Sequence, residues 1–148
     1  MRRLNVVTGA VASSIALSVG AVCLDEHGIS GYHIPLEKEL DTADVVAIGT
    51  VVSEKRVPES SPEAYDDGSV YRFRIEETLR GHRYKTLDLF SENTSARFPM
   101  DIGRRYLVFV TKARRNFGVS NCGNSGALSE RSLILEEVRK RLRNTGNG

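Results

Sequence analysis

Two cysteines, Cys23 and Cys122, constrain the fold of this chain more than any other feature of its 148 residues. Cys23 follows directly after an apolar leader, and Cys122 is the only other cysteine. In an oxidising compartment, two such thiols are more often paired than free. We therefore expect a disulfide that fastens the start of the mature protein to a late part of the fold.

The leader itself, residues 1–22, has the pattern of a secretory signal peptide. Met1, Arg2 and Arg3 form a positive start, an apolar run follows, and the small residues of the segment Ser18-Val19-Gly20-Ala21 suit a signal peptidase. The run is too short and too rich in Gly and Ser for a permanent membrane span. Cleavage before Val22 and cleavage before Cys23 both remain open. We expect an exported protein, periplasmic or extracellular, with a lipid anchor at Cys23 as the less favoured alternative.

Removal of the leader also removes most of the basic character of the chain. The sequence holds 21 Lys and Arg against 19 Asp and Glu, and Arg2 and Arg3 leave with the leader, so the mature protein is formally neutral. Residues 23–70 hold eleven acids and three bases, whereas residues 71–115 hold eleven bases and five acids. Two interpretations are open: acidic loops lying over basic strands, or a basic binding face. Global neutrality argues against a nucleic acid partner.

The mature chain, residues 23–148, has the length of one domain. Leu36 and Leu40, with charges between them, predict a short helix over residues 35–41. A second apolar face, made by Ile134, Leu135, Val138 and Leu142, predicts a C-terminal helix over about residues 129–143. Residues 58–68 are rich in Ser, Pro, Glu and Asp and predict an exposed loop.

Between these helices the sequence predicts five short strands. They are residues 44–53, with Gly49 marking a bulge or bend; residues 70–76, where apolar and charged side chains alternate; the segment around Leu87 and Leu89; residues 106–110; and the segment around Phe117 and Val119. Turn residues separate the strands and no helix crosses between them. This pattern favours a mainly-β fold in the form of a small closed barrel, with its core over about residues 43–122.

Four segments of the chain resemble the netrin-like module, the OB-type barrel of the tissue inhibitors of metalloproteinases and their bacterial relatives. They are Ala43–Lys55 (ADVVAIGTVVSEK), Tyr71–Gly81 (YRFRIEETLRG), Gly103–Phe109 (GRRYLVF) and Asn121–Ser125 (NCGNS). The order of leader, cysteine, short helix and strands is also similar, and the likeness covers about residues 23–130. The resemblance implies a five-stranded OB-like Greek-key barrel with a short N-terminal helix and a C-terminal helix.

The resemblance further implies a role for the first residues of the mature protein. In the family's inhibitors, the amine and carbonyl of an N-terminal cysteine chelate the zinc of the target protease. Cys23 is the equivalent residue here, and Leu24 would enter the specificity pocket of the protease. Asp25 stands where those inhibitors have a second cysteine. The expected function is therefore a protein-binding module with an unidentified partner, with metalloprotease inhibition through Cys23 and Leu24 as the alternative.

Other chemistries have weaker support in the sequence. Residues 123–126 (GNSG) are similar to a serine protease nucleophile segment, but they are also ordinary turn residues, and the chain is short for such an enzyme. His27, His33 and His82 lack metal-ligand spacing. Arg72 and Arg74 share one strand face, so single-stranded nucleic acid is a further alternative. We expect no catalytic residue, no metal and no cofactor.

Overall fold

The fold is built around a bent first strand and its two neighbours. The computed structural model describes residues 23–24, 27–28, 30–57, 68–94, 97–113 and 116–145. The expected leader and nearly all of the expected loop at residues 58–68 lie outside these residues. The elements are α1 (Leu36–Thr42), β1 (Val45–Val57), β2 (Gly68–Gly81), β3 (Thr86–Glu92), β4 (Arg105–Ala113), β5 (Asn116–Val119), β6 (Gly126–Ala127), the 3-10 turn η1 (Leu128–Glu130) and α2 (Ser132–Thr145).

The strands form one sheet that closes on itself. Their order is β1-β2-β3-β5-β4, and β1 also pairs with β4, which completes the barrel. All pairings are antiparallel except β3 with β5. This arrangement is a small closed barrel, so the predicted mainly-β fold class is confirmed. The short β6, which pairs with β4 at Tyr106 and Leu107, was not expected from the sequence.

Both faces of β4 are buried, and this explains its unbroken apolar sequence. Tyr106, Val108 and Val110 point into the barrel, whereas Leu107 and Phe109 point outward under the two helices. The first half of β1 behaves in the same way. A strand covered on both sides loses the apolar-polar alternation that a half-exposed strand keeps.

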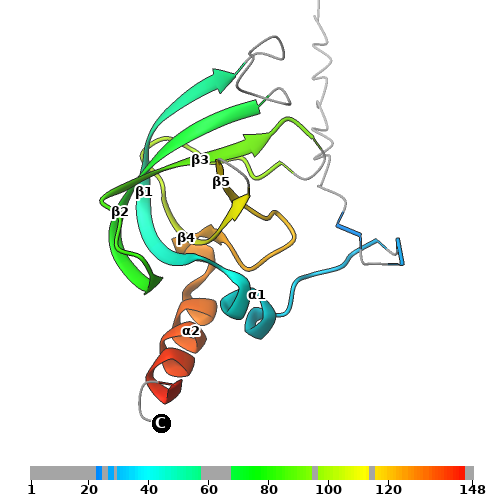
Figure 1. Ribbon diagram of the computed structural model, residues 1–148, viewed down its shortest axis with the longest axis vertical. Coiled ribbons are helices and arrows are strands. Elements are labelled where there is room, and N and C mark those ends of the chain that lie inside the picture. Colours follow the sequence, from blue (N-terminus) through cyan, green and yellow to red (C-terminus); the bar gives the residue numbers. More distant parts are fainter. Residues whose placement is uncertain are drawn as a thin grey trace, which may run out of the picture.

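The two helices cover one side of the barrel (Figure 1). Leu40 of α1 and Val138 of α2 pack with the outward side chains of β1 and β4, and the apolar face predicted for the C-terminal helix is confirmed. Arg80 of β2 fastens α1 because its guanidinium donates hydrogen bonds to the carbonyl oxygens of Leu40 and Ala43, both at 2.6 Å. A cation at the carboxyl end of a helix satisfies its free carbonyl groups.

Several of the predicted element bounds need correction. The first helix begins at Leu36, one residue later than expected, because Pro35 is its N-cap. The strand expected over residues 44–53 continues to Val57, and the one expected over residues 70–76 spans Gly68–Gly81. The C-terminal helix begins at Ser132, since residues 128–130 form η1 instead of its first turn.

Gly49 marks the bend in β1, as expected. The register between β1 and β2 shifts between Ile48 and Gly49. A Cβ atom at Gly49 would meet the carbonyl oxygen of Arg74 and lie 2.7 Å from a ring carbon of Phe73, which is fully buried in the barrel. Glycine is therefore required here by close packing between strands.

We expect Gly49→Ala to lower the free energy of unfolding by about 2–3 kcal/mol, because the added methyl group must displace backbone or the Phe73 ring. The measurement is urea unfolding of both proteins. Gly118→Ala in β5 is the matched control, since its Cβ would find only the Phe90 carbonyl oxygen at 3.7 Å. Equal losses in the two variants would contradict the packing explanation.

Candidate functional site

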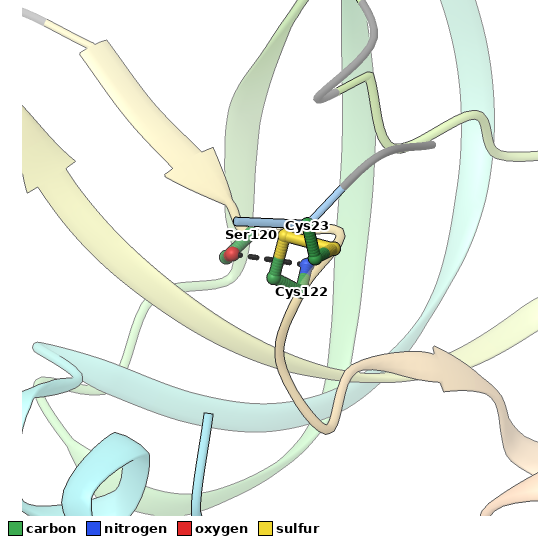
Figure 2. Close-up of a disulfide and its surroundings, with 3 residues drawn as sticks. All are labelled: Cys23, Ser120 and Cys122. Carbon is green, nitrogen blue, oxygen red and sulfur yellow. Dashed lines mark hydrogen bonds between the residues drawn. A yellow bond between two sulfur atoms is a disulfide. The ribbon is translucent and has the colours of Figure 1, made fainter. Parts of the chain in front are cut away.

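The expected disulfide joins Cys23 to Cys122, with the two Cα atoms 5.5 Å apart. Figure 2 shows the bond beside Ser120, whose hydroxyl accepts a hydrogen bond from the Cys122 amide at 3.2 Å. Ser120 directly follows β5, so the disulfide fastens the first described residues to the segment that leaves the barrel sheet. This part of the prediction is confirmed.

Backbone hydrogen bonds extend the attachment beyond the disulfide. The Cys23 carbonyl oxygen accepts from the amides of Gly31 and Tyr32, at 2.9 and 3.2 Å. Leu24 forms an isolated antiparallel bridge with Ser30, and the Ile34 amide donates to the Cys122 carbonyl at 2.8 Å. We call the described residues Cys23, Leu24 and 30–34 the N-terminal edge. It is held to the barrel by one covalent bond and by main-chain pairing.

Leu24 is the exposed apolar side chain of this edge. It is 55% exposed, whereas Cys23 is half-buried. Of the two residues expected to contact a protease, Cys23 is thus held in the disulfide and Leu24 is exposed to solvent. Their contact with a protease remains a prediction.

A buried carboxylate anchors the far end of the N-terminal edge. Glu39 of α1 is only 4% exposed, and its Oε2 accepts hydrogen bonds from the Asn124 amide at 2.6 Å and from Asn124 Nδ2 at 2.7 Å. Asn124 Nδ2 also donates to the Ile34 carbonyl at 3.0 Å, and its Oδ1 lies 3.1 Å from His33 Nε2. Burial raises the pKa of Glu39, while the bonds from Asn124 and the nearby His33 act in the opposite direction.

The buried carboxylate also explains why glycine precedes Asn124. A Cβ atom at Gly123 would collide with the Glu39 carboxylate. Neither Glu39 nor Asn124 was predicted as a site residue from the sequence. One signal was available, because Glu39 lies three residues after Leu36 and therefore shares the apolar face of the helix.

The segment at residues 123–126 is better interpreted as a turn than as the nucleophile segment of a serine protease. Ser125 is 3% exposed, and its hydroxyl accepts a hydrogen bond from the Phe109 amide of β4 at 2.9 Å. In the described part of the chain no histidine bonds to it. Ser125 therefore holds the segment after the disulfide against the barrel.

The three histidines lie in different environments. His33 contacts Asn124, His82 packs edge-on against the Tyr84 ring, and His27 is exposed. Among the described residues there is no group of three or more His, Cys, Asp and Glu side chains able to hold a metal ion. Over the same residues, no helix has both the length and the apolar character needed to cross a membrane.

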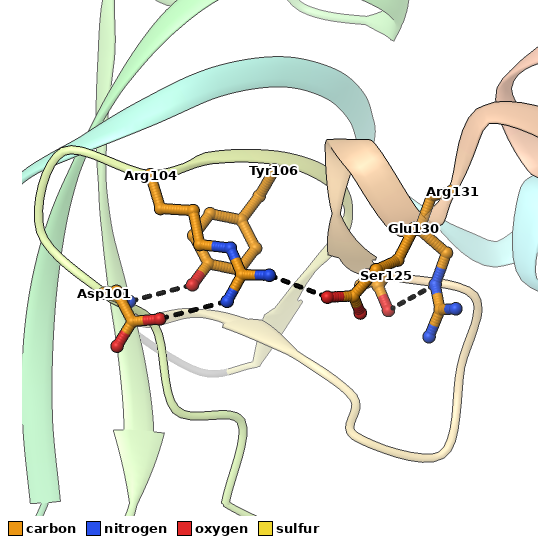
Figure 3. A network of polar contacts seen from close by, with 6 residues as sticks. All are labelled: Asp101, Arg104, Tyr106, Ser125, Glu130 and Arg131. Carbon is orange, nitrogen blue, oxygen red and sulfur yellow. Dashed lines mark hydrogen bonds and ion pairs between the residues drawn. The ribbon is translucent and has the colours of Figure 1, made fainter.

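Three arginines of the basic half of the chain, Arg72, Arg104 and Arg105, form ion pairs within the protein. Arg72 binds Asp88 through two hydrogen bonds, of 3.0 and 3.1 Å, and Arg105 lies 2.7 Å from Glu76. Arg104 bridges Asp101 and Glu130, at 3.2 and 2.7 Å (Figure 3). These pairs favour internal complementarity over a basic face on β2.

The two adjacent glutamates of β2 also form ion pairs, each with a different arginine. Glu76 faces Arg105 and the Thr50 hydroxyl, and Glu77 faces Arg139 of α2 at 2.7 Å. Neighbouring residues of a strand point to opposite faces, so the two carboxylates cannot act as one acid-base pair.

We expect replacement of both cysteines by serine to lower the free energy of unfolding by up to about 4–5 kcal/mol, because the disulfide closes a long loop in the unfolded chain. Urea unfolding of the oxidised protein, the reduced protein and the double variant measures it. Reduced wild-type protein should match the double variant. An oxidised protein no more stable than either would contradict the prediction.

We expect the pH dependence of stability to change in Glu39→Gln. Because the folded-state pKa of Glu39 is raised above its ordinary value of 4.5, the folded chain binds this proton more tightly, and stability is gained as pH falls through the folded pKa. Glutamine does not titrate. The difference in unfolding free energy, wild type minus variant, should therefore increase from neutral pH toward pH 4.5, and a constant or decreasing difference would contradict it.

Comparison with known proteins adds no relative to this picture. The sequence matches no protein-family model, and no curated protein is significantly similar to it. The N-terminal edge is therefore interpreted from its own geometry: a disulfide, a backbone ladder and a buried carboxylate hold one exposed leucine in place.

Proposed function

We propose that this chain is an exported, non-catalytic protein-binding module of the netrin-like type, and that the N-terminal edge contacts its partner. The observation that carries the proposal is the exposed side chain of Leu24 on an edge whose backbone is fixed by the disulfide and by hydrogen bonds to the Cys23 carbonyl. A surface ordered before binding loses less conformational entropy in the complex, so its contacts contribute more of their energy to affinity.

Export is supported by two independent features. The leader has the charge, apolar run and small residues of a signal peptide. The disulfide belongs to oxidising compartments, where such bonds form and persist. A protein-binding role outside the cytoplasm agrees with both features.

The inhibitor alternative requires the Cys23 carbonyl oxygen to bind zinc. That oxygen already accepts hydrogen bonds from Gly31 and Tyr32, and a carbonyl oxygen has two lone pairs. Chelation would thus have to replace at least one backbone bond of the edge. This cost favours binding through the Leu24 side chain over binding through the Cys23 carbonyl.

Site-specific photo-crosslinking tests the proposal. With a photoreactive residue at position 24 of the exported protein, we expect a discrete crosslinked partner in the extracellular or envelope fraction of the producing cells. Leu133 of α2, which is 77% exposed, is the matched control position and should give none. Reduction of the disulfide should weaken the crosslink. Equal labelling from both positions would contradict a specific edge.

The inhibitor alternative has its own test. We expect purified protein that starts at Cys23, and protein extended by Val22, to leave a panel of secreted zinc metalloproteases equally active. Inhibition by the first form alone would replace our proposal with zinc chelation, since only a free amine at Cys23 can bind the metal.

A further inference from the structure

An aromatic strip crosses from the β2-β3 connection to β5. The Tyr84 ring packs edge-on against His82, with centroids 4.6 Å apart, and against Phe117, with centroids 5.6 Å apart. Lys112 of β4 extends the strip, because its Nζ lies 6.0 Å from the centroid of the Phe117 ring. Tyr84 and Phe117 also pack against the barrel core, so the strip is anchored.

The cations along this strip differ from Arg72 and Arg105, which lie on the barrel strands and are paired with carboxylates. Arg83 and Lys85 flank Tyr84 in the chain, and both are exposed, as is Lys112. None of the three side chains forms an ion pair with any described residue, whereas Arg72 and Arg105 are paired with carboxylates. The nearest carboxylate given by a contact is that of Asp44, which accepts the backbone amide of Lys112 at 2.7 Å. The strip therefore carries three exposed cations without an ion pair to a described residue, with one carboxylate, that of Asp44, close to Lys112.

We propose that the strip formed by residues 82–85, Lys112 and Phe117 is a second binding surface, and that it takes an acidic segment of a partner protein. Carboxylates of that segment would pair with Arg83, Lys85 and Lys112, as complementary charges do across protein interfaces. The tyrosine, the phenylalanine and the arginine are residue types enriched at such interfaces.

The ring geometry distinguishes this partner from a nucleic acid. Single-stranded nucleic acid needs flat aromatic faces on which successive bases stack. Here the rings meet at interplanar angles of 65°, so neighbouring rings contact edge to face and are not stacked in parallel. The strip offers charge and aromatic edges, which suit carboxylates and mixed side chains.

The proposal uses no residue of the N-terminal edge and does not rest on its role. Loss of binding at the strip with an intact crosslink from position 24 would contradict this inference alone. The reverse result would contradict the proposed function of the edge alone.

The test uses a fluorescent peptide of alternating Glu and Tyr as the probe, with a Gln and Tyr peptide as the neutral control, and fluorescence anisotropy as the readout. We expect the full mature protein to bind the acidic peptide and to lose affinity about tenfold in the triple variant Arg83→Glu, Lys85→Glu, Lys112→Glu, since each exposed pair contributes up to about 1 kcal/mol. The triple variant Lys38→Glu, Lys55→Glu, Arg56→Glu carries the same change in net charge at exposed positions and should keep its affinity.

Two results would overturn the inference. Equal losses in the two triple variants would mean that only net charge matters, and stronger binding of oligothymidylate than of the acidic peptide would assign the strip to nucleic acid. Glutamine at the three strip positions gives a milder set of variants if the glutamate set unfolds. Near-ultraviolet circular dichroism of each variant reports whether the barrel is intact.

Discussion

The bend in β1 is the constraint on which the rest of the structure depends. The first half of this strand pairs with both β2 and β4, and its second half pairs with β2 alone. A straight strand could not pair with both β2 and β4, because the sheet must curve in order to close into a barrel. Gly49 permits the bend by leaving room for Phe73 and for the Arg74 carbonyl. Closure then buries both faces of β4 and creates the outer apolar surface that the helices cover.

The N-terminal edge builds on that closed barrel. Phe109 of β4 donates its amide hydrogen to the Ser125 hydroxyl, and this bond holds the segment after the disulfide. Asn124 in the same segment binds Glu39 of α1, while Cys122 binds Cys23. Barrel, helix and edge therefore meet within four residues of sequence, Cys122 to Ser125. That density of contacts explains how a short terminal stretch with few core side chains of its own can hold a fixed position.

The sequence predicted the barrel well and the polar anchor poorly, for a physical reason. Local apolar patterns predict strands such as β4, and the presence of only two cysteines predicts the disulfide. The ion pairs of Arg104 and the burial of Glu39 depend on which segments closure brings together. Residues 39 and 124 are far apart in the chain, and no local pattern connects them. The sixth strand was not predicted for a related reason, because a strand of two residues is too short to show an alternation of apolar and polar side chains.

Charge placement gives the two proposed surfaces different physical characters. The N-terminal edge presents an apolar side chain on a rigid frame, so its contacts would depend mainly on shape and burial. The strip around Tyr84 presents unpaired cations, so its contacts would depend on ionic strength. Arg72, Arg104 and Arg105 do not add to this difference, because carboxylates within the protein satisfy their charges. The small net charge of the sequence, +2, therefore argues against a strong field over the whole molecule, but it leaves a local site for an acidic partner.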